Sequence, residues 1–263
     1  MKMISLRMSM VRWFAWIAVV LAIVIPVRGN AQAEEQTIDP KAQELLLKMT
    51  AYLRFAQSFS FKAEITRDDV LPTGQKIERG GEADYIVRRP NRLQVTYDGD
   101  RRDVKFYYDG TNFTMVEPDK NVYGVIPASS DIDNLVKTIE ETYGFSLPMG
   151  DLISTDLYVK ILKGVKNSSD LGLSKIRGVS CHHLSFTLET IDLQLWVADG
   201  KQPVPCKFVL TYKEETGSPE YAAILSDWDF RDRTPNDPSF TVQLPPNSNK
   251  VDFIPDRTVE EEP

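Results

Sequence analysis

Residues 81–127 read GEADYIVRRPNRLQVTYDGDRRDVKFYYDGTNFTMVEPDKNVYGVIP, and this stretch decides the fold. Apolar and polar residues alternate in short runs, and turn residues such as Gly, Asp, Asn and Pro separate the runs every eight to ten residues. Period-two alternation with regular turns is typical of antiparallel strands that have one apolar face. The stretch therefore predicts a meander, and its apolar face carries many aromatic rings.

Alternate side chains of a strand lie on one face, so the meander and the strand before it place nine apolar residues together. We expect this face to be concave and to line an apolar cavity that binds a ligand. A ring-rich face that packs under helices is also typical of a plain hydrophobic core, and the sequence leaves both interpretations open. The nine residues are Phe61, Ile65, Leu93, Val95, Tyr97, Phe106, Tyr108, Phe113 and Met115.

A helical insertion follows the meander at about residues 130–162 and is expected to lie over this face as a lid. Ser130 or Asp131 supplies an N-cap, and Gly144 ends the first helix. Five apolar residues between them recur at helical spacing, which predicts an amphipathic helix with one buried side. The five lid residues are Ile132, Leu135, Val136, Ile139 and Tyr143.

Helix and strand patterns also flank the meander. Asp39 as N-cap and Pro40 at the first helical position predict an N-terminal amphipathic helix. Gly80 and Gly81 predict a bend or bulge within a strand, and the polar residues 163–174 predict a loop. Further strands are expected at residues 59–65, 75–88, 179–188, 193–197, 206–212, 220–230 and 240–244.

These elements predict an α+β fold that is mainly antiparallel β. We expect a half-open curved sheet, or incomplete barrel, of about 10–11 strands. The N-terminal helix and the helical lid should lie on its concave face.

The first 33 residues have the pattern of a cleaved secretory signal peptide. An uncharged run of 13 residues follows basic residues, and Ala31, Gln32 and Ala33 form an A-x-A cleavage site before Glu34. The run is shorter than the roughly 20 residues that span a bilayer, so no transmembrane anchor is expected after cleavage, and an uncleaved anchor is the alternative. The expected organisation is a signal peptide at 1–33, one domain at 34–255 and an acidic flexible tail at 256–263.

The chain carries 31 basic and 38 acidic residues, and cleavage would remove four basic ones. The net charge of −7 would then become −11, from 27 basic against 38 acidic residues. An acidic exported protein is a poor partner for nucleic acid or for an anionic membrane surface.

Cys181 and Cys206 are the only cysteines, and an even number in an exported protein favours a disulfide. They fall on the first and third of three consecutive predicted strands, about 9.6 Å apart, beyond the Cα reach of about 7 Å for a disulfide. The irregular loop at residues 199–205 would allow the chain to bring Cys206 next to Cys181. A structural disulfide is therefore expected, with buried free thiols as the alternative.

Catalytic signatures are sparse, and no enzyme activity, cofactor or metal site is expected. His182 and His183 are the only histidines, and as neighbours on a predicted strand they point to opposite faces and cannot bind one metal together. The sequence has no GxSxG, HExxH, glycine-rich phosphate loop or paired CxxC. A hydrolase that uses two carboxylates is the remaining enzyme alternative, because the 38 acidic residues provide many pairs.

The order of elements behind the signal peptide resembles that of the LolA/LolB-like fold. More closely, the chain is similar to an uncharacterised branch of predicted periplasmic proteins within that superfamily. The resemblance covers nearly the whole mature chain and is carried by RRPNRLQVTYDGD (88–100), YYDGTNFTMVEPDKNVY (107–123), DLQLWVADGKQPVPCKFVLTYKEE (192–215) and DWDF (227–230).

Members of this superfamily are half-open β-barrels with helices over the concave face, so the resemblance implies that fold. The characterised members that this chain resembles are carriers, which hold the acyl chains of lipoproteins. The resemblance therefore implies a soluble periplasmic, non-catalytic carrier of a lipid or acylated lipoprotein. Another branch resembles periplasmic sensors, which implies as the alternative a sensor or scaffold that binds an envelope protein partner without lipid.

The exported protein should begin at or near Glu34, because the A-x-A site directs cleavage after Ala33. Intact-mass analysis of the exported protein measures this directly. A mass that includes residues 1–33 would contradict cleavage and favour the uncleaved anchor.

Overall fold

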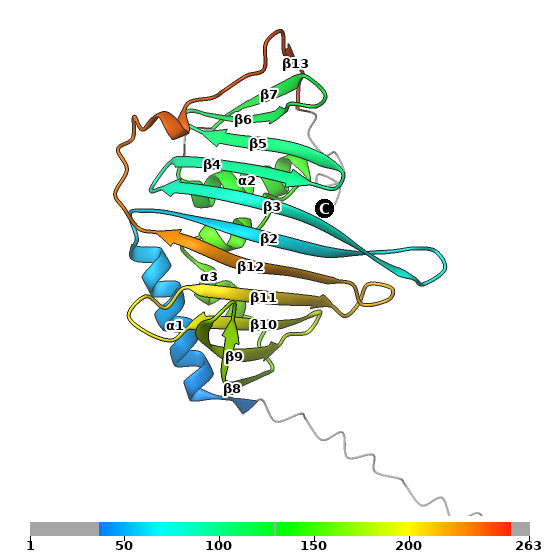
Figure 1. Cartoon of the computed structure of the whole chain (residues 1–263), viewed down its shortest axis with the longest axis vertical. Coiled ribbons are helices and arrows are strands. Elements are labelled where there is room, and N and C mark those ends of the chain that lie inside the picture. The colour runs from blue at the N-terminus through cyan, green and yellow to red at the C-terminus, as the bar shows by residue number, and fades with distance from the viewer. Residues whose placement is uncertain (1–36, 129, 254–263) are drawn as a thin grey trace, which may run out of the picture. The chain divides into compact units, whose positions relative to one another are not determined.

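A single β-sheet dominates the part of the chain that the computed structural model describes, which is residues 37–128 and 130–253 (Figure 1). The predicted signal peptide, its cleavage site between Ala33 and Glu34, and the predicted tail at 256–263 lie outside these residues. Within them, 13 strands pair in the order β1-β8-β9-β10-β11-β12-β2-β3-β4-β5-β6-β7-β13. β1 with β8 and β7 with β13 are parallel, and all other pairs are antiparallel.

This sheet confirms the predicted fold class, since the long strands are antiparallel and the two added edge strands have only two residues each. The strands are β1 (Thr37–Ile38), β2 (Ser58–Val70), β3 (Lys76–Arg88), β4 (Arg92–Gly99), β5 (Arg102–Tyr108), β6 (Asn112–Glu117), β7 (Val122–Pro127), β8 (Asn167–Ile176), β9 (Val179–Thr187), β10 (Ile191–Ala198), β11 (Pro205–Tyr212), β12 (Glu220–Asp229) and β13 (Asn249–Lys250). The helices are α1 (Pro40–Phe55), α2 (Ile132–Tyr143) and α3 (Leu157–Leu162), with short 3₁₀ helices η1 (Gly150–Ile153) and η2 (Pro238–Phe240).

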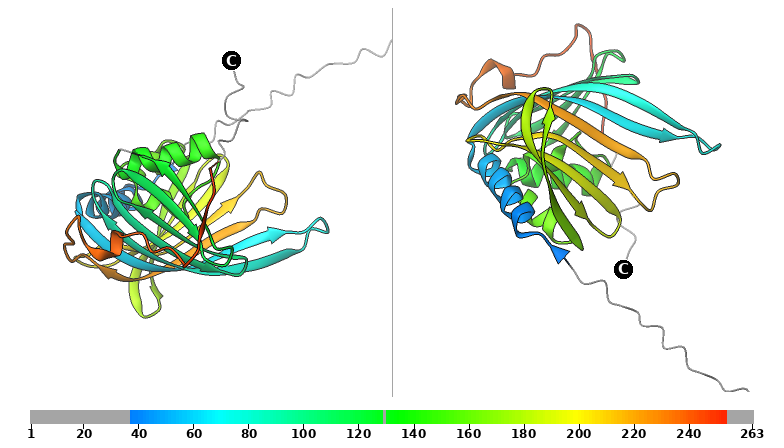
Figure 2. Two further views of the ribbon diagram at one scale, coloured as in Figure 1. Left: turned by 90° about the horizontal axis from the view of Figure 1, so that it is seen from above. Right: turned by 60° about the horizontal axis from the view of Figure 1, so that its bottom comes forward.

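The sheet is curved, and α1, α2 and α3 lie on its concave side (Figure 2). α1 begins as predicted, because the Asp39 carboxylate accepts a hydrogen bond from the Lys41 amide at 2.8 Å. One side of α1, including Leu46, Met49 and Leu53, is buried against the sheet and joins the main core. Helix and sheet thus share one hydrophobic core between them.

The predicted loop at residues 163–174 is wrong, because most of it forms β8. This strand lies next to the sheet edge and exposes about every second side chain, so its sequence needs little apolar character. The predicted strand at residues 240–244 is also wrong. Phe240 ends η2, and no strand follows until β13 among the described residues.

Gly80 and Gly81 form no bulge, since the β2–β3 register runs through both without a shift, so the bulge alternative of the predicted bend or bulge is wrong. The ring of Tyr97 lies over Gly81 and Gly99 instead. A Cβ built at either glycine would come within 2.5 Å of the Tyr97 hydroxyl oxygen. The glycines at 81 and 99 therefore make room for this ring.

The outer face of β5 and β6 is covered by the C-terminal segment that follows β12 (Figure 1). Tyr107, Thr114 and Val116 alternate with the concave residues, yet they are only 0–4% exposed. Tyr107 is hydrogen-bonded to the backbone of Gln243. The same segment then supplies β13, which pairs with β7 and protects that edge of the sheet.

Cys181 and Cys206 form the expected disulfide, with Cα atoms 7.1 Å apart. The two residues lie on β9 and β11, on either side of β10. The register between β10 and β11 shifts between Trp196 and Val197, which leaves Cys206 without a register partner on β10. This bulge brings Cys206 towards Cys181. The bond packs with Trp196 and Val209 in an apolar cluster separate from the main core.

Reduction of this disulfide should lower the free energy of unfolding by about 3 kcal/mol, because the bond closes a loop of intermediate length in the unfolded chain. Denaturant titrations of the oxidised and reduced protein measure the difference. A Cys181→Ala/Cys206→Ala variant is the control and should unfold like the reduced protein under both conditions. Two free thiols titrated in oxidised, denatured protein would contradict the bond.

Candidate ligand site on the concave face

The structure brings the nine predicted cavity residues together on the concave face. They come from β2, β4, β5 and β6, and cross-strand pairs such as Val95 with Phe106 and Tyr108 with Phe113 align them in rows. Seven of the nine are at most 5% exposed. Tyr97 and Met115 are partly buried and pack against the same core. The set is therefore contiguous, and in this arrangement helices cover it.

α2 is the helix that covers this set, and it begins and ends where the sequence predicts. The Asp131 carboxylate accepts a hydrogen bond from the Asn134 amide at 2.8 Å, and Gly144 closes the helix in the left-handed conformation with φ 65°. Four of the five predicted lid residues are 0–2% exposed, and Tyr143 is partly buried. The apolar side of α2 thus packs into the main core.

A small number of hydrogen bonds fix the start of α2 to the sheet. The Tyr108 hydroxyl donates to the Ser130 carbonyl oxygen at 2.5 Å and accepts from the Ser130 amide at 3.0 Å. The Ile132 amide donates to the Pro90 carbonyl oxygen at 2.9 Å. Tyr108 therefore links the predicted cavity directly to the predicted lid.

The segment that contains α2 joins the two edges of the open sheet. Its described residues are 128 and 130–166, and we call them the crossing segment. β7 before it lies next to one edge of the sheet, and β8 after it lies next to the other. α2, η1 and α3 therefore span the concave face in one continuous stretch (Figure 2). The described residues of this segment belong to no strand, so its movement breaks no strand pairing.

One cation is buried beneath the crossing segment. The Arg89 guanidinium donates from Nη2 to the Ile153 carbonyl oxygen at 2.9 Å and lies 5.7 Å from the centre of the Phe59 ring. Burial lowers the pKa of Arg89, and the nearby Asp133 carboxylate acts in the opposite direction. Arg89 is 8% exposed, and its Nε has no hydrogen-bond partner among the described residues. Opening the segment would admit water to Nε, which lowers the free energy needed for that movement.

Two tyrosine hydroxyls also lie in the buried interior. Tyr85 donates a hydrogen bond to the carbonyl oxygen of Pro148 in the crossing segment. The Tyr221 hydroxyl oxygen is buried without a partner among the described residues. Burial raises the pKa of both phenols above the ordinary value. The concave side therefore contains polar groups among its rings, unlike a purely aliphatic core.

A series of aromatic rings, which we call the ring ladder, leads across the concave side from α1. Tyr52 contacts Phe230 at 4.9 Å between ring centres, and Phe230 stacks with Trp228 at 5.9 Å. Trp228 stacks with Phe61 at 4.5 Å, and Phe61 stacks with Tyr85 at 4.7 Å. The ladder thus ends beneath the crossing segment, at the tyrosine that bonds to it.

Only Phe61 of the ring ladder belongs to the predicted site. The alternation of Trp228 and Phe230 is visible in the sequence and could have identified two more rings. The β12–β2 register shifts between Ser226 and Asp229, however, so the pattern alone does not show which face these rings take.

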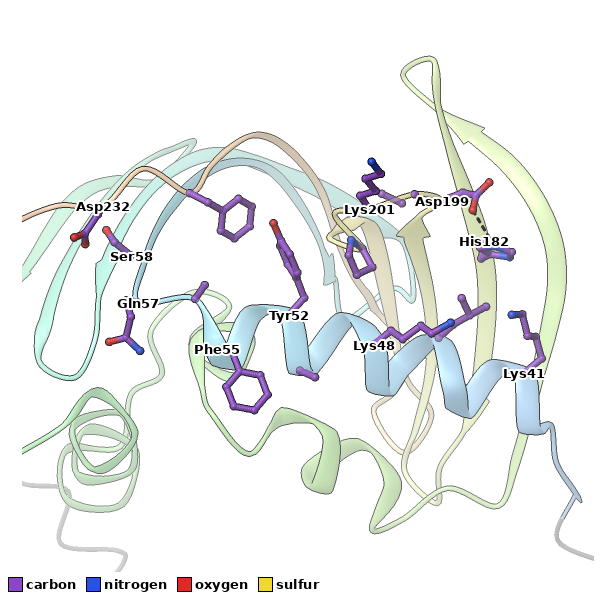
Figure 3. Close-up of a pocket in the computed structure, with 17 residues that line it drawn as sticks. Lys41, Lys48, Tyr52, Phe55, Gln57, Ser58, His182, Asp199, Lys201 and Asp232 are labelled. Atoms are coloured by element: carbon purple, nitrogen blue, oxygen red, sulfur yellow. Dashed lines mark ion pairs between the residues drawn. The ribbon is translucent and has the colours of Figure 1, made fainter.

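A groove of about 950 Å³ lies beside α1 at the outer end of the ring ladder (Figure 3). We call it the α1 groove. Its walls are α1, the start of β2, the β10–β11 connection and the residues after β12. Its lining includes Tyr52 and Phe230 together with Lys41, Lys48 and Lys201, and it contains none of the nine predicted cavity residues.

The two histidines point to opposite faces, as predicted. His182 faces the α1 groove, with its ring nitrogens 3.6 Å from an Asp170 carboxylate oxygen and 3.5 Å from one of Asp199. His183 stacks on Trp196 at 4.0 Å between ring centres. No group of three or more His, Cys, Asp or Glu residues within the described ranges has an arrangement that could hold a metal ion.

An open sheet with helices over an apolar concave face is thus the class of structure that the chain adopts. The chain belongs to the family described as "Predicted periplasmic protein (DUF2092)", which matches residues 42–254. This match confirms the expected family branch and the periplasmic location. No curated protein sequence matches the chain. In the described part of the chain, no helix has the length and apolar character needed to cross a membrane.

Several solved structures are similar to this one. The lipoprotein LppX of Mycobacterium tuberculosis is 16% identical, with a TM-score of 0.48, over 74% of this chain and 98% of that one. LprF from Mycobacterium bovis is 13% identical, with a TM-score of 0.47, over 80% and 99%. A LolA superfamily protein from Nitrosomonas europaea is 15% identical, with a TM-score of 0.36, over 73% and 94%. At these values the fold assignment rests on the topology of the chain itself.

Phe253 covers the C-terminal end of the lid. Its ring stacks with Phe145 at 5.9 Å and meets Tyr143 edge-on at 5.7 Å. It also lies over Gly124, where a Cβ would come within 2.6 Å of the ring. The C-terminal segment therefore holds the lid from the side opposite Tyr108.

Phe253→Ala should loosen this end of the lid, because two ring pairs worth about 0.5–1.5 kcal/mol each are lost. Amide hydrogen exchange in residues 139–145 should become about tenfold faster or more, while exchange in β3 to β5 stays unchanged. Val251→Ala is the matched control, since Val251 is 43% exposed. Equal exchange in the two variants would contradict a role for Phe253 in holding the lid.

Proposed function

We propose that this protein is a periplasmic, non-catalytic carrier or binding protein for a lipid or an acylated lipoprotein. The apolar chain of the ligand would lie against the nine-residue concave face. The observation that carries this proposal is the crossing segment. It crosses the apolar face from one edge of the sheet to the other, and its described residues take part in no strand pair.

The mechanism is an exchange of one apolar cover for another. In the closed arrangement the apolar side of α2 occupies the concave face. When the crossing segment moves away, the sheet keeps its strand pairs and exposes its row of rings. An acyl chain then replaces α2, and water reaches the Arg89 guanidinium and the Tyr221 hydroxyl.

The free energies set a minimum length for the acyl chain in this exchange. Each buried methylene contributes about 0.8 kcal/mol, so a chain of about 16 carbons contributes roughly 12 kcal/mol. Micromolar affinity needs about 8 kcal/mol. The difference, roughly 4 kcal/mol, is available to open the lid and order the chain. A chain of about ten carbons would leave no free energy to open the lid.

A sensor or scaffold that binds an envelope protein is the second candidate. The near-complete burial of seven cavity residues favours it, because a filled core needs no cargo. In that case α2 is packed permanently, and the outer surface would carry the function.

Phe106→Asp separates the two candidates. Phe106 is 1% exposed and stacks with Phe113 at 5.8 Å, so a carboxylate here cannot remain under the closed lid. If the protein is a carrier, its lid can open and expose the new carboxylate to water. The substitution then destabilises the protein by no more than the free energy of lid opening. The variant should keep the circular dichroism of the sheet and lose uptake of a fluorescent fatty acid that the wild type binds.

Val159→Asp is the matched control, because Val159 is 63% exposed on the same crossing segment. This variant should fold and bind like the wild type. A wild type that binds no fatty acid, together with a Phe106→Asp variant that unfolds, would contradict the carrier and favour the sensor.

A further inference from the structure

We propose that the α1 groove is the entrance to the concave site and that its lysines bind an anionic head group. The ligand would be a single-chain amphiphile with a carboxylate or phosphate head, and its chain would follow the ring ladder under the crossing segment. This inference rests on the proposed carrier function and adds the chemical class of the ligand and its route.

The two ends of the α1 groove differ in chemistry. Lys41, Lys48 and Tyr52 rise from the same side of α1 towards the β10–β11 connection, which carries Lys201 (Figure 3). Tyr52 lies nearer the C-terminal end of α1 and meets Phe230. One end is therefore rich in ammonium groups and the other in aromatic rings, which is the arrangement that an amphiphile needs.

The lysine end places three ammonium groups beside the carboxylates of Asp199 and Asp170, on an acidic protein. The chain as a whole has a net charge of −7. Asp199 is the carboxylate of the groove lining at this end, while Asp232 lies beside Ser58 at the far end (Figure 3). Lys41 and Lys48 share a single carboxylate, that of Glu44, so their charge is only half compensated.

The ring ladder connects this groove with the buried site. Tyr52 and Phe230 line the groove, and they are also the first two rings of the ladder. The next rings are those of Trp228 and Phe61. Phe61 lies in the main hydrophobic core, Trp228 packs against that core, and Phe61 is one of the nine cavity residues. A chain that enters at Phe230 therefore meets rings continuously until it reaches the crossing segment.

The volume of the groove suits one chain and its head group. Sites for small organic ligands usually measure about 300–1,000 Å³, and the α1 groove measures about 950 Å³. Its open side lets a head group stay in contact with water while the chain is buried. This is how long amphipathic groups settle at a boundary between apolar and aqueous surroundings.

Tryptophan fluorescence tests the route. Of the four tryptophans in the sequence, only Trp196 and Trp228 lie beyond the predicted signal peptide. Trp228 is part of the ring ladder, whereas Trp196 packs by the disulfide in the separate cluster. Bromine quenches indole only at short range. Stearic acid brominated in mid-chain should quench a Trp196→Phe variant, in which Trp228 remains, and leave a Trp228→Phe variant unquenched.

Head-group preference tests the lysines. Tetradecanoic acid, tetradecyl phosphate and tetradecanol share one chain and differ in charge. The acid and the phosphate should bind wild type at least tenfold more tightly than the alcohol, and the preference should weaken with salt. A Lys41→Gln/Lys48→Gln/Lys201→Gln variant should lose the preference and keep its affinity for the alcohol.

The matched control replaces Lys62, Lys120 and Lys250 with Gln, which removes the same charge from exposed positions outside the groove. This variant should keep the preference. Equal affinity for the three probes, or quenching of Trp196 instead of Trp228, would overturn the entrance while leaving the carrier function intact. Failure of wild type to bind any of the probes would overturn both.

Discussion

The need to cover one apolar face of an open sheet dominates this structure. Eleven long strands present rows of rings and branched side chains on their concave side, and an exposed surface of that size would be unstable in water. The cover comes from α1 and from the crossing segment, which is tied to the sheet at its two ends. The same geometry buries the apolar face and keeps the cover outside the strand pairing of the sheet.

The central meander, α1, α2 and their caps were predictable because each is determined by local periodicity and capping residues. Val95, Phe106 and Phe113 alternate so regularly that their shared face follows from the sequence. The outer face was harder to predict, since buried Tyr107 is hydrogen-bonded to Gln243, which lies 136 residues later in the sequence. Strand β8, which lies next to the sheet edge, was not predicted because a strand that is largely exposed needs no apolar alternation.

The candidate site also has one part that was predictable from the sequence and one part that was not. The nine cavity residues come from strands that follow one another in the chain, so local pattern places them together. The ring ladder and the α1 groove combine α1, β2, β12 and the β10–β11 connection, which only the sheet order brings together. The β12 bulge adds a change of register that periodicity does not reveal. Long-range assembly therefore decides where a ligand would enter, and short-range pattern decides where it would rest.

Mass spectrometry of organic extracts from natively purified protein tests the carrier function most directly. A protein that exchanges its lid for an acyl chain should retain such a chain through purification. The extract should contain acyl lipids in an amount comparable with the protein, and the Phe106→Asp variant should yield none. Wild-type protein that carries no lipid, even when purified from lipid-rich envelope fractions, would contradict the carrier.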